Sequence, residues 1–434
     1  MKPSRSIVSP FHGIRYQVTE SRDLSSRLAP PYDVIGESLQ QELYARDEHN
    51  FVRIESPQPA GPETDESNRY TQAAATLESW LTRGVMVRDE RPACYVLEQE
   101  FEVAGERWRR RGVFVALRLP EEGERYVLSH ESTMAAPKAD RLRLMQACAA
   151  ITSPIMVMSE DKESRLLSQL WQVSGDPDAT AVDHEGVVHR LWAVNADSVT
   201  EAICAAVGPG PLFVADGHHR FETAITCRDG MRELAPSAPA NAGFNYGLAL
   251  VTSARDEALK ILPTHRLVSG LGARGREAMA ARINDLCRVI RVRSARGVPP
   301  SMIGDESGAP PGGYVFTAAF PDRRWYVLIV PDEKLKHSES VVASLDVSIL
   351  HEYLLDPVLA EAPGAKVTYL HDEQAAAEAV ERGECDFAFL LRPASVQDVL
   401  RAARAGERMP QKSTFFYPKA PAGLVMSSLS AEPV

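Results

Sequence analysis

The chain has 434 residues, of which 44% are hydrophobic and 25% charged, so it is long enough for several domains with sizeable cores. Its 59 acidic residues outnumber its 48 basic ones, and the net charge of −11 disfavours a broad surface for duplex DNA. Because it has no apolar run of about 18 residues and no signal-peptide core at its start, we expect a cytoplasmic protein without membrane or nucleic acid partners.

Two proline-flanked turns lie near the N-terminus. Residues 10–16 read PFHGIRY, and residues 29–35 read APPYDVI, in which Tyr32 and Asp33 follow a double proline. Proline fixes its own φ angle, so the second segment favours a rigid turn that displays these two side chains. A substrate contact and a packed surface turn fit this pattern equally well.

A helix and a hairpin are predicted next. Tyr70, Ala73, Leu77 and Trp80 recur at helical spacing, which predicts a helix over residues 70–81. Two β-rich runs, 94–103 and 112–119, are separated by a polar turn around a glycine and predict an antiparallel hairpin.

Residues 126–155 combine a strand end, a polar turn and a helix. The polar turn contains His130, Glu131, Ser132 and Thr133. Pro137 then opens a helix, with an expected apolar stripe of Leu142, Met145 and Ala149. Lys138 and Arg141 are neighbours near the helix start. A carboxylate flanked by hydroxyls, with two cations in the next helix, fits a general base and phosphate clamps, whereas a helix cap with solvated charges is the alternative.

The most informative segment is residues 211–224, PLFVADGHHRFETA. Its pattern predicts a buried strand over 212–215, a turn at Asp216 and Gly217, and a helix from His218 onward. A helix start presents backbone N–H groups and the positive end of the helix dipole, and therefore favours phosphate binding. Arg220 can add a planar fork of donors, and Asp216 can cap the helix or bind Mg²⁺.

In the last quarter of the chain, predicted strands alternate with predicted helices. Strands are predicted over 325–330, 367–370 and 386–391, and helices over 346–355, 373–381 and 396–404. Such alternation is typical of α/β layers. The final segment, residues 409–419, reads MPQKSTFFYPK and sets Lys412, Ser413, Thr414 and Lys419 around aromatic residues; taken alone, it favours an aromatic strand with solvated lysines.

Other motifs are excluded. The six cysteines are scattered singly, and the remaining histidines show no metal-ligand spacing. Neither a Walker phosphate loop nor a GxSxG nucleophile elbow is present.

In these segments the chain resembles the family catalogued as domain of unknown function 1015, which is related to the ParB/sulfiredoxin-like fold. The carriers are PFHGIRY, APPYDVI, HEST with KADRL, SPI at Ser153, VADGHHRFETA, LPTHRLV at Leu262 and MPQKSTFFYPK. The resemblance extends over almost the full length, and DGHHR is highly specific.

The resemblance implies a fold and an activity. ParB-like proteins bind nucleotides with a GxxR helix start, which residues 217–220 match, and proteins similar in DGHHR include free serine kinases, which convert L-serine to O-phosphoserine. On that resemblance, Glu131 would be the general base, and Asp216, His218, His219 and Arg220 would bind and polarise the phosphates.

We therefore expect an α/β (α+β) fold in three regions. A ParB/sulfiredoxin-like nucleotide-binding core over 89–233, with an insertion at about 156–210, would lie between an N-terminal segment, 1–88, and a C-terminal α/β region, 234–434.

The leading hypothesis is an Mg²⁺-dependent kinase that uses ATP, ADP or CTP to phosphorylate free L-serine. The candidate residues are Glu131, Asp216 and His218 for catalysis; Gly217, His218, His219, Arg220, Lys138 and Arg141 for phosphate; His130, Ser132, Thr133, Tyr32, Asp33, Lys412 and Ser413 for substrate; and Asp216 for magnesium. The alternatives are a ParB-like nucleotide-binding regulatory or interaction protein and a nucleotide hydrolase. A homodimer is left open.

Overall fold

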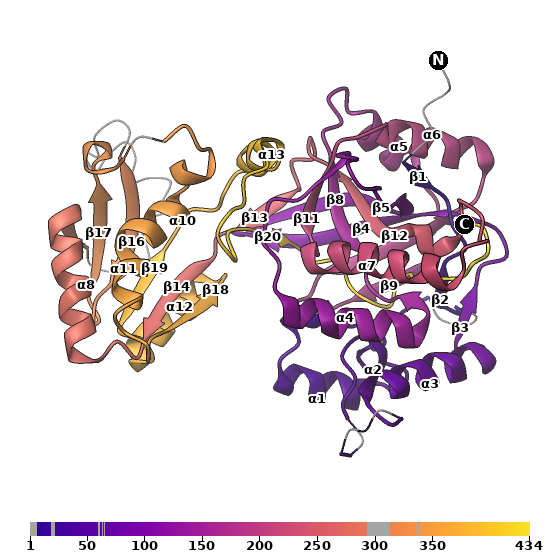
Figure 1. The fold of residues 1–434 in the computed structure, drawn as a ribbon, viewed down its shortest axis with the longest axis horizontal. Coiled ribbons are helices and arrows are strands. Elements are labelled where there is room, and N and C mark those ends of the chain that lie inside the picture. The colour runs from indigo at the N-terminus through magenta and orange to yellow at the C-terminus, as the bar shows by residue number, and fades with distance from the viewer. Residues whose placement is uncertain are drawn as a thin grey trace. The chain divides into compact units, whose positions relative to one another are not determined.

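The computed structural model describes residues 7–18, 22–59, 61–62, 64, 66–292, 313–336 and 338–434. It consists of two compact units, which are described separately (Figure 1). The first unit comprises Met1–Ser129, Thr133–Lys260 and Pro418–Val434, and the second comprises His130–Ser132 and Ile261–Tyr417.

The first unit is built on a large mixed sheet with the strand order β6-β11-β8-β12-β5-β4-β10-β9, to which β1 adds by pairing with β5. The strands are β1 (Val8–Ser9), β4 (Cys94–Val103), β5 (Glu106–Arg118), β6 (Val127–Leu128), β8 (Ile155–Ser159), β9 (Ala179–Val182), β10 (Val188–Val194), β11 (Leu212–Asp216) and β12 (Tyr246–Ser253). The pairs β11–β6 and β12–β8 are parallel, whereas the other pairs in this sheet are antiparallel. The central strands β8 and β12 are almost wholly buried, which explains their apolar sequences.

Helices and short strand pairs complete the first unit. The helices are α1 (Glu37–Arg46), α2 (Val52–Glu55), α3 (Arg69–Thr82), α4 (Ala135–Cys148), α5 (Arg165–Gln172), α6 (Asp197–Val207) and α7 (His218–Leu234), with the 3₁₀ turns η1 (Tyr32–Val34) and η2 (Gly243–Asn245). Strand β2 (Ile14–Tyr16) pairs with β3 (Met86–Arg88), and β7 (Ala150–Ile151) pairs with β21 (Ser427–Ser428). Helix α7 packs on β8 and β12, α4 packs on α7, and α3 packs on α4 (Figure 1).

The predicted helix and hairpin are both present. Helix α3 is closed at its start by a capping box around Asn68, and its buried face includes Ala73 and Leu77. Strand β4 matches the predicted bounds, but β5 begins at Glu106, six residues before the expected start. The charged residues omitted from the prediction belong to the ladder, where Arg111 forms an ion pair with Glu98 of β4 at 2.8 Å.

Helix α4 differs in two respects from the prediction. It begins two residues before Pro137, and its buried positions are Arg141, Leu144 and Met145. Ala149, assigned to the apolar stripe, is instead the left-handed residue that ends the helix, with a φ of 46°. Because an arginine is among the buried residues, the buried face of α4 differs from the face that the spacing of its apolar residues predicts.

The second unit contains an antiparallel sheet with the order β15-β17-β16-β19-β14-β18. The strands are β14 (His265–Ser269), β15 (Arg288–Val292), β16 (Tyr314–Ala319), β17 (Trp325–Val330), β18 (Lys366–Leu370) and β19 (Phe387–Leu390), with β13 (Lys260–Leu262) and β20 (Phe415–Tyr417) as a separate pair. The helical segments are α8 (Gly272–Leu286), α10 (Asp346–Ile349), the π-helical η5 (Leu350–Leu355), α11 (Asp356–Leu359), α12 (Glu373–Arg382) and α13 (Val396–Ala405), with the 3₁₀ turns η3 (Asp332–Lys334) and η4 (Val342–Ser344).

The predicted α/β class is confirmed, and the predicted alternation in the last quarter agrees with β17, α10 with η5, β18, α12, β19 and α13 within one or two residues. The sequence of residues 297–313 is rich in glycine and proline, which predicts a loop, and residues 297–312 lie outside the described part of the chain. None of the helices in the described ranges is long and apolar enough to cross a membrane.

Candidate functional site

The start of helix α7 is shaped by its sequence. Strand β11 brings a buried apolar run to the turn, and Gly217 follows as the N-cap residue with a φ of +87°. A Cβ atom at this position would lie 2.9 Å from Nε of Arg220, so glycine allows both the backbone conformation and the close approach of the arginine. The first turn of this 17-residue helix therefore combines backbone N–H groups with a guanidinium.

A carboxylate between two cations lies at this turn. Nη2 of Arg220 is 2.6 Å from Oδ2 of Asp216, and Nζ of Lys419 binds Oδ1 of the same residue. The side chains are 7%, 16% and 12% exposed for Arg220, Asp216 and Lys419, so water weakens these contacts little. We call these three residues the Asp216 triad.

The electrostatics of the triad keep all three groups charged. Burial alone would raise the pKa of the Asp216 carboxyl, but the charges of Lys419 and Arg220 outweigh it and hold that pKa well below its usual range. Burial lowers the pKa of Lys419, but Asp216 and then Asp33 oppose it, and the net shift is upward. The triad thus carries a net positive charge beside the positive end of a helix.

Lys419 is held in place by a buried pair in the β4–β5 hairpin. Nη2 of Arg110 donates to the carbonyl of Pro418 at 2.6 Å, and Nε2 of Gln99 donates to the carbonyl of Lys419 at 3.0 Å. Gln99 and Arg110 are cross-strand partners and are each 1% exposed. The interpretation of Lys419 as a solvated lysine is therefore wrong, because a contact about 200 residues away in sequence buries it.

A second group of polar residues lies next to the triad. Asp33 and Tyr32, both in η1, contribute after Asp216 to raising the pKa of Arg220. The Arg141 guanidinium lies 4.2 Å from the Tyr32 ring centroid and donates to the carbonyl of Glu55. Burial raises the pKa of Tyr32 to about 12, although the charge of Arg220 opposes this shift. These two predicted substrate contacts are thus brought to the predicted phosphate site.

Glu55 is a buried carboxylate that the sequence analysis did not single out. It is fully buried and accepts hydrogen bonds from Thr152 Oγ1 at 2.7 Å and Ser153 Oγ at 2.9 Å, and it lies 3.7 Å from Arg141. It is the last residue of the short helix α2, where it follows the buried Ile54. Arg141 is therefore anchored within the unit by Glu55 and Asp140, although it was predicted as a phosphate clamp.

The remaining predicted residues of the first unit link α4 to α7. Nζ of Lys138 lies 2.9 Å from Oε2 of Glu222, and Thr133 Oγ1 donates to the same oxygen. Nε2 of His219 accepts a hydrogen bond from the backbone N–H of Met134 at 2.9 Å. His218, the first residue of α7, is 5% exposed. These contacts hold the α4 start against the DGHHR turn.

Five predicted residues belong to the second unit, namely His130, Glu131, Ser132, Lys412 and Ser413. His130 is 1% exposed, with Nε2 at 3.3 Å from Oγ1 of Thr414, and Glu131 forms a bridge with Met409. Ser132 is exposed. The Lys412 carbonyl accepts a hydrogen bond from Arg266, and Ser413 Oγ donates to the carbonyl of Pro410. The predicted roles of these five residues stay predictions.

The residues at the turn do not fit direct magnesium ligation by Asp216. Each of its oxygens already binds a cation, whereas Mg²⁺ needs a carboxylate oxygen of its own. Within the described ranges, no group of three or more His, Cys, Asp or Glu residues is placed to hold a metal ion. Magnesium as a cofactor stays a prediction, with no ligand assigned here.

Comparisons with known proteins bear on these motifs. The family model described as "Protein of unknown function (DUF1015)" matches residues 8–348, which confirms the family that the motifs indicated.

A conserved hypothetical protein from Pyrococcus furiosus is 15% identical, with 73% of this chain and 95% of that chain covered and a TM-score of 0.36. A mutant free serine kinase in complex with AMP is 14% identical, with 70% and 86% covered and a TM-score of 0.36. SbnI from Staphylococcus aureus, with a C-terminal truncation, is 11% identical, with 71% and 84% covered and a TM-score of 0.35. The search of curated proteins found no match.

Proposed function

We propose that this chain, which belongs to the DUF1015 family, transfers the terminal phosphate of a nucleotide to the hydroxyl of free L-serine. The observation that carries the proposal is the Asp216 triad at the glycine-opened start of α7. The DGHHR motif, through which the chain resembles free serine kinases, supports serine as the acceptor.

The triad suits the demands of phosphoryl transfer. Little covalent chemistry is required of the protein, since most of the rate enhancement comes from aligning the acceptor and stabilising charge on the transferred group. In the proposed reaction the serine oxygen forms a bond to the terminal phosphorus, the bond to the nucleotide's leaving oxygen breaks, and the hydroxyl proton passes to a base. The backbone N–H groups of the α7 start, Arg220 and Lys419 would stabilise the phosphate oxygens.

Asp216 takes a positioning role in this proposal instead of the catalytic role first assigned to it. A carboxyl whose pKa lies well below its usual range is too weak a base for a serine hydroxyl. Its two ion pairs instead fix the directions of Arg220 and Lys419. Glu131, in the second unit, stays the predicted general base.

The direct test uses the purified full-length chain with Mg²⁺, L-serine and one nucleotide at a time: ATP, ADP or CTP. O-phospho-L-serine, measured by mass spectrometry, is the expected product with at least one of these donors. D-serine and L-alanine serve as controls, because the first has the wrong configuration and the second lacks the hydroxyl.

Two outcomes would contradict the proposal. Phosphate release that does not depend on serine would identify a nucleotide hydrolase. Tight nucleotide binding without turnover of serine would favour a nucleotide-binding regulator.

A further inference from the structure

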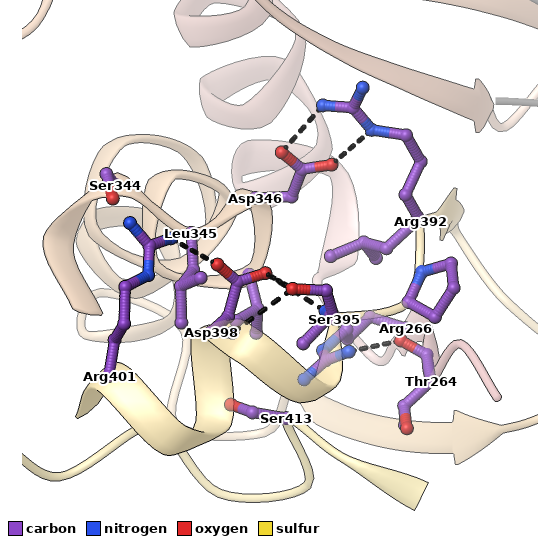
Figure 2. Close-up of a pocket in the computed structure, with 14 residues that line it drawn as sticks. Thr264, Arg266, Ser344, Leu345, Asp346, Arg392, Ser395, Asp398, Arg401 and Ser413 are labelled. Carbon is purple, nitrogen blue, oxygen red and sulfur yellow. Dashed lines mark hydrogen bonds and ion pairs between the residues drawn. The ribbon is translucent and has the colours of Figure 1, made fainter. Parts of the chain in front are cut away.

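The second unit contains a polar pocket of about 320 Å³, all of whose lining residues belong to that unit. It is lined by the start of β14, the first turn of α10 with the residues before it, the loop after β19, the first turns of α13 and Ser413 (Figure 2). Its charged lining residues are Arg266, Asp346, Arg392, Asp398 and Arg401.

Two of the three arginines are neutralised by carboxylates. Arg392 binds Asp346 through two contacts of 2.8 and 3.0 Å, and Arg401 lies 2.5 Å from Asp398 (Figure 2). These side chains of Arg392 and Arg401 are 40% and 59% exposed. Neither pair leaves a net charge in the pocket.

Arg266 is the exception. It is 1% exposed, and its guanidinium donates to the backbone carbonyls of Thr264 and Lys412. Among the described residues, its buried Nε has no hydrogen-bond partner, and no carboxylate forms an ion pair with it. A buried cation whose hydrogen-bond partners are neutral carbonyls is costly, so an anion bound in the pocket would stabilise it.

Two neighbours of Arg266 in the described part of the chain are a tyrosine and a histidine, and neither is a carboxylate. Its guanidinium lies 5.4 Å from the centroid of the Tyr369 ring. Burial is the main reason why the pKa of His265 falls to about 4, so this neighbour is neutral at pH 7. Burial also lowers the pKa of Arg266, to about 10, which still leaves it protonated at neutral pH.

We propose that this pocket binds a small metabolite with one carboxylate, which pairs with Arg266. The lining carries three positive and two negative side chains, so a monoanion balances its charge. A phosphate dianion would exceed that balance and face the carboxylates of Asp346 and Asp398.

The hydroxyl groups of the lining indicate further polar groups on the ligand. Ser344 Oγ donates to the carbonyl of Val341, and Ser395 Oγ donates to Oδ2 of Asp398. Each hydroxyl retains acceptor capacity and suits a ligand hydroxyl or ammonium group. The ligand class is therefore a small hydroxy acid or amino acid.

The test is saturation-transfer NMR on the full-length chain with sodium L-lactate. We expect saturable binding by the wild type and at least about a tenfold weaker affinity for Arg266→Lys, which keeps the charge but loses the planar fork. Ala394→Phe, which adds bulk to the pocket lining without touching Arg266, should abolish binding, whereas Ala394→Ser should bind as the wild type does.

Three results would overturn the inference: no saturable binding of lactate by the wild type, equal affinity in Ala394→Phe and the wild type, or binding of sodium phosphate but not of lactate. The Ala394 pair keeps the test decisive if Arg266→Lys fails to fold. Phosphorylation of serine is not needed for any of these measurements.

Discussion

Two of the buried arginines, Arg220 of the first unit and Arg266 of the second, are compensated in opposite ways. Arg220 of the first unit shares the Asp216 carboxylate with Lys419, whereas Arg266 of the second unit donates to two backbone carbonyls and, among the described residues, forms no ion pair. Burial lowers both pKa values, but the nearby carboxylates reverse the shift for Arg220 and raise its pKa, whereas that of Arg266 falls to about 10.

The difference separates two kinds of anion site. In the first unit an internal carboxylate keeps the cations in fixed directions, which suits a site that must be preorganised before its ligand arrives. In the second unit the charge is uncompensated, which suits a site that is completed by its ligand. Substitutions that remove or create a partner carboxylate test this contrast.

The largest effect on stability is expected for Asp216→Asn. The change removes the carboxylate that Arg220 and Lys419 share and should lower the free energy of unfolding by about 3 kcal/mol. Because the folded pKa of Asp216 is depressed, its contribution is present above the unfolded pKa of about 4 and is lost as the pH falls. Urea unfolding at neutral and acidic pH measures both effects, and the variant should lose less stability in acid than the wild type.

Asp176→Asn is the matched control, because that side chain is 90% exposed and its ion pair is long, at 3.6 Å. It should change stability by less than about 0.5 kcal/mol. An equal loss in both variants would mean that the triad is not specifically stabilised by its carboxylate.

Lys419→Met should have the largest effect on activity. It removes one of the two cations proposed to stabilise the phosphate and should lower kcat/KM for serine phosphorylation by about 100-fold. Lys162→Met, which changes an exposed lysine of the same unit, should leave kcat/KM unchanged. If Lys419→Met retained full activity, Lys419 would have no part in the reaction.

Gly217→Ala should have a smaller effect. The left-handed φ of +87° and the contact with Arg220 should cost about 1 to 2 kcal/mol of stability and displace the guanidinium. Gly230→Ala lies in the interior of the same helix, and a Cβ there meets no atom within 4 Å, so it should be neutral or stabilising. Thermal unfolding compares the two, and equal stability would argue against strain at Gly217.

Arg266→Met should have the smallest effect on the unliganded protein. Replacing an unpaired buried charge with an apolar side chain of similar length is expected to change stability by only about 1 kcal/mol, since the lost carbonyl contacts are offset by the relief of desolvation. Arg220→Met, which removes a charge with an ion-pair partner, should cost about 3 kcal/mol. Denaturant unfolding without added ligand measures both, and equal losses would remove the contrast between the two sites.

Local patterns predicted much of the fold. The strand-to-helix transition at Gly217 agrees with the sequence because an apolar run, a glycine and a helical pattern follow one another without interruption. The predicted start of β5 is six residues too late because its first residues are mostly charged, which is typical of a loop. In the fold these residues pair with β4. A local sequence pattern therefore predicts a segment correctly when neighbouring residues determine its structure. It fails when contacts with a partner strand determine that structure.

The candidate site was less predictable for the same reason. Asp216 ends β11 and lies only four residues before Arg220 in the first turn of α7, so their meeting could be expected from the sequence. The burial of Lys419 depends on Gln99 and Arg110, and the contacts of Glu55 depend on α4 and the loop before β8. Neither set of partners can be read from neighbouring residues.

By itself, then, the sequence determined the family, the α/β class and the glycine-opened helix start, because each follows from residues that are adjacent in the chain. Only the tertiary structure decided which charged groups form ion pairs: it brought Lys419 to Asp216, and it buried Arg266 without an ion-pair partner among the residues that the structure describes. The physical reason is that charge compensation depends on distance and burial in space, and sequence separation constrains neither over hundreds of residues.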